Sequence, residues 1–195
     1  GVVYDPLKDE LFTASRGAGA QLNGRRLRVS DAKSLDGALI GTGFPFKDVS
    51  TFDQYQRQFF AVAGTTSGMR RAGSAALDLA DVAAGRFDAF WEQRLMAWDI
   101  AAGIVLIREA GGVVTDLEGD DVQIAHSGLV AGGPAMHAWL LETVQQAMYA
   151  AGEAMYKASQ AEAEAKAAGG SKPAEDDVVD ADFTEVKDDD QQKSA

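Results

Sequence analysis

The chain has 195 residues, of which 46% are hydrophobic and 25% are charged, a balance typical of a globular protein with a sizeable core. It contains no cysteine and only two histidines, which excludes disulfides, thiolate metal sites and a histidine-rich zinc site, so any metal would be held mainly by oxygen ligands of the kind that magnesium prefers. The formal net charge of −12 argues against direct nucleic-acid binding and against broad binding to an anionic membrane.

The first thirty residues carry strand and turn signals. Residues 2–4 and 11–14 predict two strands around a turn at residues 5–9. Residues 21–22 and 27–29 flank Asn23-Gly24, and Asn-Gly supplies the positive φ angles that a tight hairpin turn requires. The sequence therefore begins with antiparallel strands.

Residues 38–145 alternate between strand and helix patterns. Strands are predicted at residues 38–42, 87–91, 113–115 and 129–131. Helices are predicted at residues 52–62, 74–84, 99–110 and 134–144; glycines follow the second and third, and Pro134 lies in the first turn of the last. This alternation predicts an α/β fold, mixed α+β in detail.

The composition changes near residue 146. Residues 146–195 contain 12 acidic and five basic residues, a net charge of −7. We expect a folded portion at residues 1–145, an Ala/Glu/Lys-rich helical extension at 146–168, and a disordered acidic tail at 169–195. No apolar run approaches the ~20 residues of a membrane span and no signal peptide is recognised, so we expect a cytoplasmic protein.

Asp99 is the sharpest candidate for chemistry, because Trp98-Asp99 falls where a strand and loop lead into a helix. One interpretation is an N-cap, since aspartate is favoured at helix starts. The other is a carboxylate presented to a divalent cation. The two interpretations are compatible.

Two further segments are candidates for substrate contacts. Glu92 follows a predicted strand end; it is either a solvated charge or an acceptor for a substrate hydroxyl. Gly73-Ser74-Ala75 precedes a helix, where Ser74 is either an N-cap or part of an anion site formed by free backbone N–H groups. Arg70 and Arg71 nearby would add positive charge, although two adjacent arginines are more often a surface pair.

The two histidines do not complete a catalytic set. His126 is expected in a polar loop, and His137 is expected as a satisfied or surface residue of the last helix. No serine–histidine–aspartate set and no nucleotide-binding fingerprint can be assigned, so the sequence designates no catalytic residue.

Several short motifs occur in an order and spacing typical of one family. They are Gly1-Val2-Val3-Tyr4-Asp5-Pro6, Leu22-Asn23-Gly24, Thr42-Gly43-Phe44-Pro45, Arg71-Ala72-Gly73-Ser74-Ala75, Trp98-Asp99 and Glu109-Ala110-Gly111-Gly112. Over residues 1–145 the chain thereby resembles the inositol monophosphatase family, in particular bacterial inositol-1-monophosphatases of the extragenic-suppressor type.

The resemblance implies the C-terminal half of a layered αβαβα sandwich and Mg²⁺-dependent hydrolysis of a phosphate monoester, such as inositol 1-phosphate or a related sugar-alcohol phosphate. By this resemblance Asp99 is a metal ligand, Gly73, Ser74 and Ala75 line the substrate site, and Glu92 contacts a sugar-alcohol hydroxyl. Relatives are commonly homodimers, and bacterial members are associated with the transcription machinery. A non-catalytic binding module is therefore the alternative function.

Three departures from the family pattern qualify this expectation. The family's paired-glutamate and Asp-Pro-x-Asp-Gly-Thr motifs, which supply most metal ligands, lie upstream of the position of Gly1, so we expect the chain as given to be weakly active or inactive. Arg94 stands where relatives usually carry glycine. Residues 152–157 and 175–187 resemble the C-terminus of a DnaK-type chaperone, which indicates a fusion fragment with a chaperone-like tail, an engineered joining or a misassembled reading frame.

Overall fold

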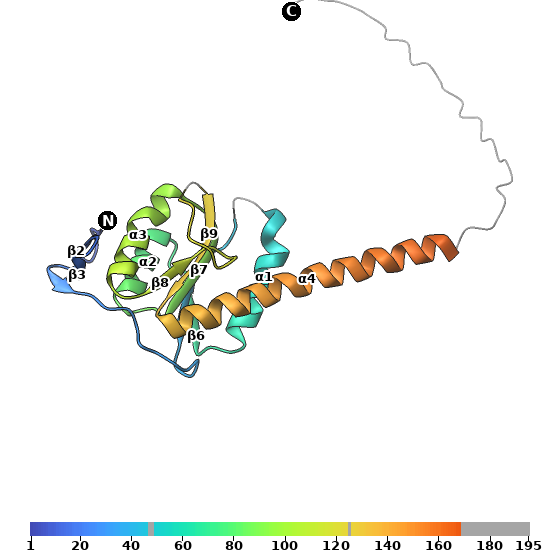
Figure 1. Ribbon diagram of the computed structural model, residues 1–195, viewed down its shortest axis with the longest axis horizontal. Helices are drawn as coiled ribbons and strands as arrows, with labels where there is room; N and C mark the ends of the chain where they lie inside the picture. The colour runs from blue at the N-terminus through green and yellow to red at the C-terminus, as the bar shows by residue number, and fades with distance from the viewer. Residues whose placement is uncertain (47–48, 125, 169–195) are drawn as a thin grey trace, which may run out of the picture. The chain divides into compact units, whose positions relative to one another are not determined.

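A computed structural model describes residues 1–46, 49–124 and 126–168 of the chain (Figure 1). It divides into a compact unit, Gly1–Lys157, and a second unit, Ala158–Ala195. The predicted acidic tail at 169–195 lies outside the described residues. None of the described helices combines the length and apolarity that crossing a bilayer requires.

The first four strands form an antiparallel sheet in chain order: β1 (Val2–Asp5), β2 (Glu10–Ser15), β3 (Gly19–Leu22) and β4 (Arg25–Arg26). Asn23 and Gly24 have φ angles of 48° and 78° and form the predicted two-residue turn. The predicted partner strand at residues 27–29 is wrong, because this short turn already pairs Leu22 with Arg25. Leu27 is buried, and its N–H still donates a 2.8 Å hydrogen bond to the Ala20 carbonyl of β3.

The second sheet is mixed, with the strand order β6-β5-β7-β9-β8. Its members are β5 (Leu39–Thr42), β6 (Gly68–Arg70), β7 (Ala89–Met96), β8 (Val113–Thr115) and β9 (His126–Gly132). β5 runs parallel to β6 and β7, whereas β9 runs antiparallel to β7 and β8. The carboxyl ends of β5, β6 and β7 therefore lie at one edge of the sheet.

Helices cover both faces of the second sheet. A short 3-10 helix, η1 (Val49–Thr51), leads into α1 (Phe52–Ala63), and α2 (Ala75–Ala83), α3 (Ala97–Glu109) and α4 (Pro134–Ala168) follow. Figure 1 shows α2 and α3 on one side of the sheet, and α1 with the beginning of α4 on the other. The first sheet packs on the α2–α3 layer.

Two apolar cores lie on the two faces of the second sheet. In β7, Phe90 joins the core shared with α2, α3 and the first sheet, whereas its neighbour Trp91 joins the core under α1 and α4. This alternation is what a strand buried on both faces requires. The described residues thus form four successive layers, sheet–helices–sheet–helices, of the expected αβαβα sandwich.

Several element boundaries differ from the sequence prediction. Strand β6 was not predicted, and β7 continues past the predicted end at Trp91 to Met96 through an irregular register between Glu92 and Leu95. Helix α4 runs from Pro134 to Ala168 without a break. The predicted domain boundary at residues 145/146 stays a prediction.

Candidate functional site

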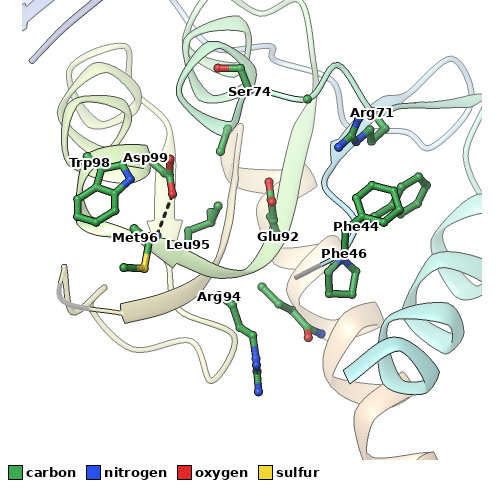
Figure 2. A pocket seen from close by; sticks show the side chains of 14 residues that line it. Phe44, Phe46, Arg71, Ser74, Glu92, Arg94, Leu95, Met96, Trp98 and Asp99 are labelled. Carbon is green, nitrogen blue, oxygen red and sulfur yellow. Dashed lines mark hydrogen bonds between the residues drawn. The ribbon is translucent and has the colours of Figure 1, made fainter. Parts of the chain in front are cut away.

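A pocket of about 790 Å³ opens at the edge where β5, β6 and β7 end and where α2 and α3 begin. Residues 44–46, 71, 73–75, 92–96, 98 and 99 line it (Figure 2). All five predicted site residues are among them: Gly73, Ser74, Ala75, Glu92 and Asp99. Crevices at the carboxyl ends of sheet strands are common ligand sites in α/β proteins.

Asp99 lies in the first turn of α3, where Oδ2 accepts a hydrogen bond from the backbone N–H of Met96 at 2.9 Å (Figure 2). The predicted N-cap position is wrong: Met96 is the N-cap residue, and Asp99 is three positions further on. From there the carboxylate still satisfies one of the free N–H groups at the helix start and interacts favourably with the helix dipole. Its Oδ1 accepts no hydrogen bond from the described residues.

Ser74 is the N-cap residue of α2, as predicted, with an extended backbone at φ −139°. Its hydroxyl makes no capping hydrogen bond. The first backbone N–H groups of α2 therefore lie without intrahelical partners next to the pocket, where they can bind an anion or a hydroxyl oxygen. The preceding Gly73 has a φ of 99°, which favours glycine.

Glu92 lies in the middle of β7 and not at a strand end as predicted. Its carboxyl group rests against Gly43, since a Cβ added at Gly43 would lie 2.1 Å from Glu92 Cδ. Burial, followed by the charges of Asp78 and Asp99, raises the pKa of Glu92 to about 7, while Arg71 opposes this shift. A partly neutral carboxyl can both accept and donate a hydrogen bond to a substrate hydroxyl.

Known proteins resemble this chain in sequence and in fold. The sequence model for the inositol monophosphatase family matches residues 1–149. The chain belongs to the inositol monophosphatase family. Two curated relatives are an inositol-1-monophosphatase from Rhizobium meliloti, 50% identical over 145 residues, and the Nus factor SuhB of Pseudomonas aeruginosa, 56% identical over 146 residues.

Each of these two alignments covers 74% of this chain and 54% of the relative. The crystal structure of extragenic suppressor protein suhB from Bartonella henselae superposes with a TM-score of 0.71 at 46% identity, covering 74% of this chain and 55% of that one. The chain therefore spans about half the length of the inositol monophosphatase family members that it matches. The roles of the five predicted site residues stay predictions.

Asp78 is a feature of this family member that the sequence analysis missed. It lies on α2, one turn after Ala75, with 2% of its surface exposed. Its Oδ1 has no hydrogen-bond partner among the described residues, and burial raises the pKa of Asp78 to about 7. The sequence signal that could have identified Asp78 was its place as a single carboxylate in an apolar stretch, between Ala75-Ala76-Leu77 and Leu79-Ala80.

The remaining sequence candidates lie apart from the carboxylates. Arg94 occupies the irregular part of β7 with a φ of 58°, and in Figure 2 its side chain points away from Glu92 and Asp99. His137 is buried and shares a 3.0 Å hydrogen bond with Thr115, so the expectation of a satisfied histidine is confirmed. His126 begins β9 and is not in a loop.

The donor set available to a metal is small. Within the described ranges no three His, Cys, Asp or Glu side chains are grouped closely enough to hold a metal ion. Asp99 and Glu92 both line the pocket, but magnesium needs about six oxygen ligands. The described side chains therefore do not form a magnesium site by themselves.

Proposed function

We propose that this chain forms the substrate-binding portion of a magnesium-dependent phosphatase acting on inositol 1-phosphate or a related sugar-alcohol phosphate. The observation that carries the proposal is the convergence of Gly73, Ser74, Ala75, Glu92 and Asp99 on one pocket. They come from three separate segments of the sequence, in a chain of the inositol monophosphatase family. A relative at 50% identity is named inositol-1-monophosphatase.

Each residue then has a role that its position supports. The backbone N–H groups at the start of α2 and the Ser74 hydroxyl bind substrate oxygens, and Gly73 leaves the backbone open to close approach. Glu92 orients a substrate hydroxyl, and Asp99 contributes one oxygen to a magnesium site. A magnesium ion bound there supplies polarisation of the phosphoryl oxygens and a water of lowered pKa.

The chain as given turns over substrate weakly or not at all, because the described residues cannot supply the oxygen ligands that magnesium needs. By the family resemblance, most of the metal-binding carboxylates belong to the paired-glutamate and Asp-Pro-x-Asp-Gly-Thr motifs, which the sequence of residues 1–195 does not contain. This agrees with the match to only 54% of each of the two relatives.

A chimera tests this function. The part of the Pseudomonas aeruginosa relative that lies outside the match is joined before Gly1, and phosphate release from inositol 1-phosphate is measured with and without Mg²⁺. The chain alone should release little or no phosphate, and the chimera should release it only with Mg²⁺. Asp99→Asn should abolish this activity, whereas Asp36→Asn, an exposed carboxylate outside the pocket, should not. A folded chimera without magnesium-dependent turnover would refute the proposal.

A second candidate function is a non-catalytic partner of the transcription machinery. It is favoured by the names of relatives in Pseudomonas aeruginosa, 56% identical, and in Escherichia coli, 53% identical, both called Nus factor SuhB. Pull-down of RNA polymerase by the purified chain tests it, and Asp99→Asn should retain that binding. A homodimer, a cytoplasmic location and a chaperone-like tail stay predictions.

A further inference from the structure

Arg71 is a pocket-lining cation that the proposed hydrolysis does not use. Its guanidinium carbon lies 5.1 Å from the ring centre of Phe46 and 5.9 Å from that of Phe44. It also lies beside Gly73, where an added Cβ would be 3.2 Å from the Arg71 Nη1. Two aromatic rings and a glycine thus hold the guanidinium group at the wall of the pocket, at distances typical of cation–π contacts.

Arg71 and Asp99 are on different sides of Glu92. In the view of Figure 2, Glu92 lies between the Asp99 carboxylate and the Arg71 side chain. All three residues line the same pocket. A substrate whose hydroxyl contacts Glu92 would therefore extend toward Asp99 at one end and toward Arg71 at the other.

The guanidinium group retains its capacity to bind a ligand. Among the residues that the structure describes, no carboxylate forms an ion pair with Arg71 and no carbonyl accepts a hydrogen bond from it, so the ring contacts leave its N–H groups available. A planar guanidinium presents several donors in a fixed fork that matches phosphate and carboxylate groups. Arg94, the other arginine of the pocket wall, points away from Glu92 in Figure 2.

The pocket has room for more than one charged group. Its volume of about 790 Å³ lies in the upper part of the range of about 300–1,000 Å³ for small-molecule sites. A substrate that places one phosphate by Asp99 fills one end and leaves the Arg71 end for a second substituent.

We propose that Arg71, held between the Phe44 and Phe46 rings and Gly73, recognises a second anionic group on the substrate, so that this pocket prefers sugar or sugar-alcohol monophosphates carrying a further phosphate or carboxylate. This inference rests on the proposed function, because it presumes that the pocket takes a phosphate monoester. Arg71 acts here in specificity and not in bond breaking.

The test compares binding of matched ligands to the full chain in the presence of Mg²⁺ by isothermal titration calorimetry. The ligands are inositol 1-phosphate, inositol 1,4-bisphosphate and glucuronic acid 1-phosphate, and the last two distinguish a phosphate from a carboxylate as the second anion. The wild-type chain should bind at least one of the two ligands with a second anionic group tenfold or more tighter than inositol 1-phosphate, as expected for charge-assisted hydrogen bonds.

Variants test whether Arg71 causes the preference for ligands with a second anionic group. Arg71→Gln should remove the preference, so that the ligands with a second anionic group bind no tighter than inositol 1-phosphate. Arg71→Lys should keep part of it, since the charge remains but the planar fork is lost. Arg70→Gln is the matched control, because Arg70 is exposed on β6, donates to the carbonyl of Met69 at 2.8 Å and does not line the pocket. Circular dichroism verifies that each variant is folded.

The outcomes separate the two proposals. Binding of inositol 1-phosphate without any preference, or a preference that survives Arg71→Gln or disappears with Arg94→Gln, overturns the role of Arg71 and leaves the phosphatase proposal intact. Failure of all three ligands to bind both the wild-type chain and the chimera overturns both.

Discussion

The Glu92 carboxyl occupies the space in which any residue other than glycine at position 43 would place its Cβ. An added Cβ would lie 2.2 Å and 2.3 Å from the two carboxyl oxygens, much closer than non-bonded atoms approach. The Glu92 side chain can therefore adopt its observed conformation only if residue 43 is glycine. The identity of residue 43 and the placement of a substrate-facing carboxyl are coupled.

This coupling predicts the effect of Gly43→Ala. The methyl group should displace the Glu92 side chain, lower the free energy of unfolding by about 1–3 kcal/mol, and weaken binding of inositol 1-phosphate. Denaturant unfolding and calorimetry measure the two effects. In Glu92→Ala the same substitution should cost at least about 1 kcal/mol less, because the clashing group is gone.

Gly68→Ala is the control for a glycine in a strand, since its Cβ would approach the Leu39 Cδ1 no closer than 3.3 Å and the Arg70 Nη1 no closer than 3.7 Å. If Gly43→Ala lowered the free energy of unfolding equally in the wild-type and Glu92→Ala backgrounds, the coupling between residues 43 and 92 would be contradicted.

Sequence reasoning at the residue scale found side chains with local signals and missed those defined by packing. Ser74 and Asp99 stand at helix starts, where a cap or ligand role is visible in the sequence. Asp78 and Gly43 acquire their meaning only when α2 and β5 are placed beside β7. No spacing along the chain encodes such contacts, so a tertiary structure was needed to find them.

At the scale of elements, the start of α3 gives Asp99 a structural role that is separate from any metal. Its Oδ2 accepts the Met96 N–H, and its charge lies at the positive end of the helix. Alanine removes both interactions, whereas asparagine keeps an acceptor oxygen and loses the charge. The two substitutions therefore separate the helix start from the metal site.

We expect Asp99→Ala to lower the free energy of unfolding by about 1 kcal/mol, a decrease in melting temperature of roughly 2–4 °C for a chain of this size. Asp99→Asn should cost less, because the hydrogen bond is retained. Both variants should abolish magnesium-dependent activity in the chimera. Thermal unfolding and phosphate release provide the measurements, and an asparagine variant as unstable as the alanine variant would contradict this division.

The elements that were predicted well have a strong local period or a defined end. Helix α2 ends before Gly85, and the turn at Asn23-Gly24 lies where it was expected. Strand β6 has only three residues, Gly68–Arg70, and is a strand because it pairs with β5 in the parallel direction. The extension of β7 to Met96 depends likewise on pairing with β9 across an irregular register. Pairing between distant segments has no signature in a single short window.

At the scale of the whole molecule, the layers explain why the pocket lies where it does. The α2–α3 layer is held between two sheets by one shared core, and both helices begin at the edge where β5, β6 and β7 end. The layered class could be predicted from alternating patterns and from the family resemblance. The strand order could not, because it depends on which distant strands pair.

Because the chain divides after Lys157, we expect residues 1–157 to be sufficient for folding. The buried residues of α4, among those whose side chains the structure describes, are Met136, His137, Leu140 and Val144, all before residue 145. The predicted boundary at 145/146 and the division after residue 157 both leave these residues with the folded unit. A chain ending at Lys157 should therefore retain the core under α1 and α4.

Deletion of residues 158–195 removes 11 acidic and four basic residues, so the formal net charge falls in magnitude from −12 to −5. Since none of the α4 residues that the described side chains show to be buried is removed, the melting temperature should change by less than about 2 °C, equivalent to less than about 1 kcal/mol. Deletion from Pro134 onward should prevent folding, because losing each large buried side chain alone costs about 2–5 kcal/mol. Differential scanning calorimetry distinguishes the two truncations. A drop of more than about 5 °C for the chain ending at Lys157 would mean that the fold depends on residues beyond this division.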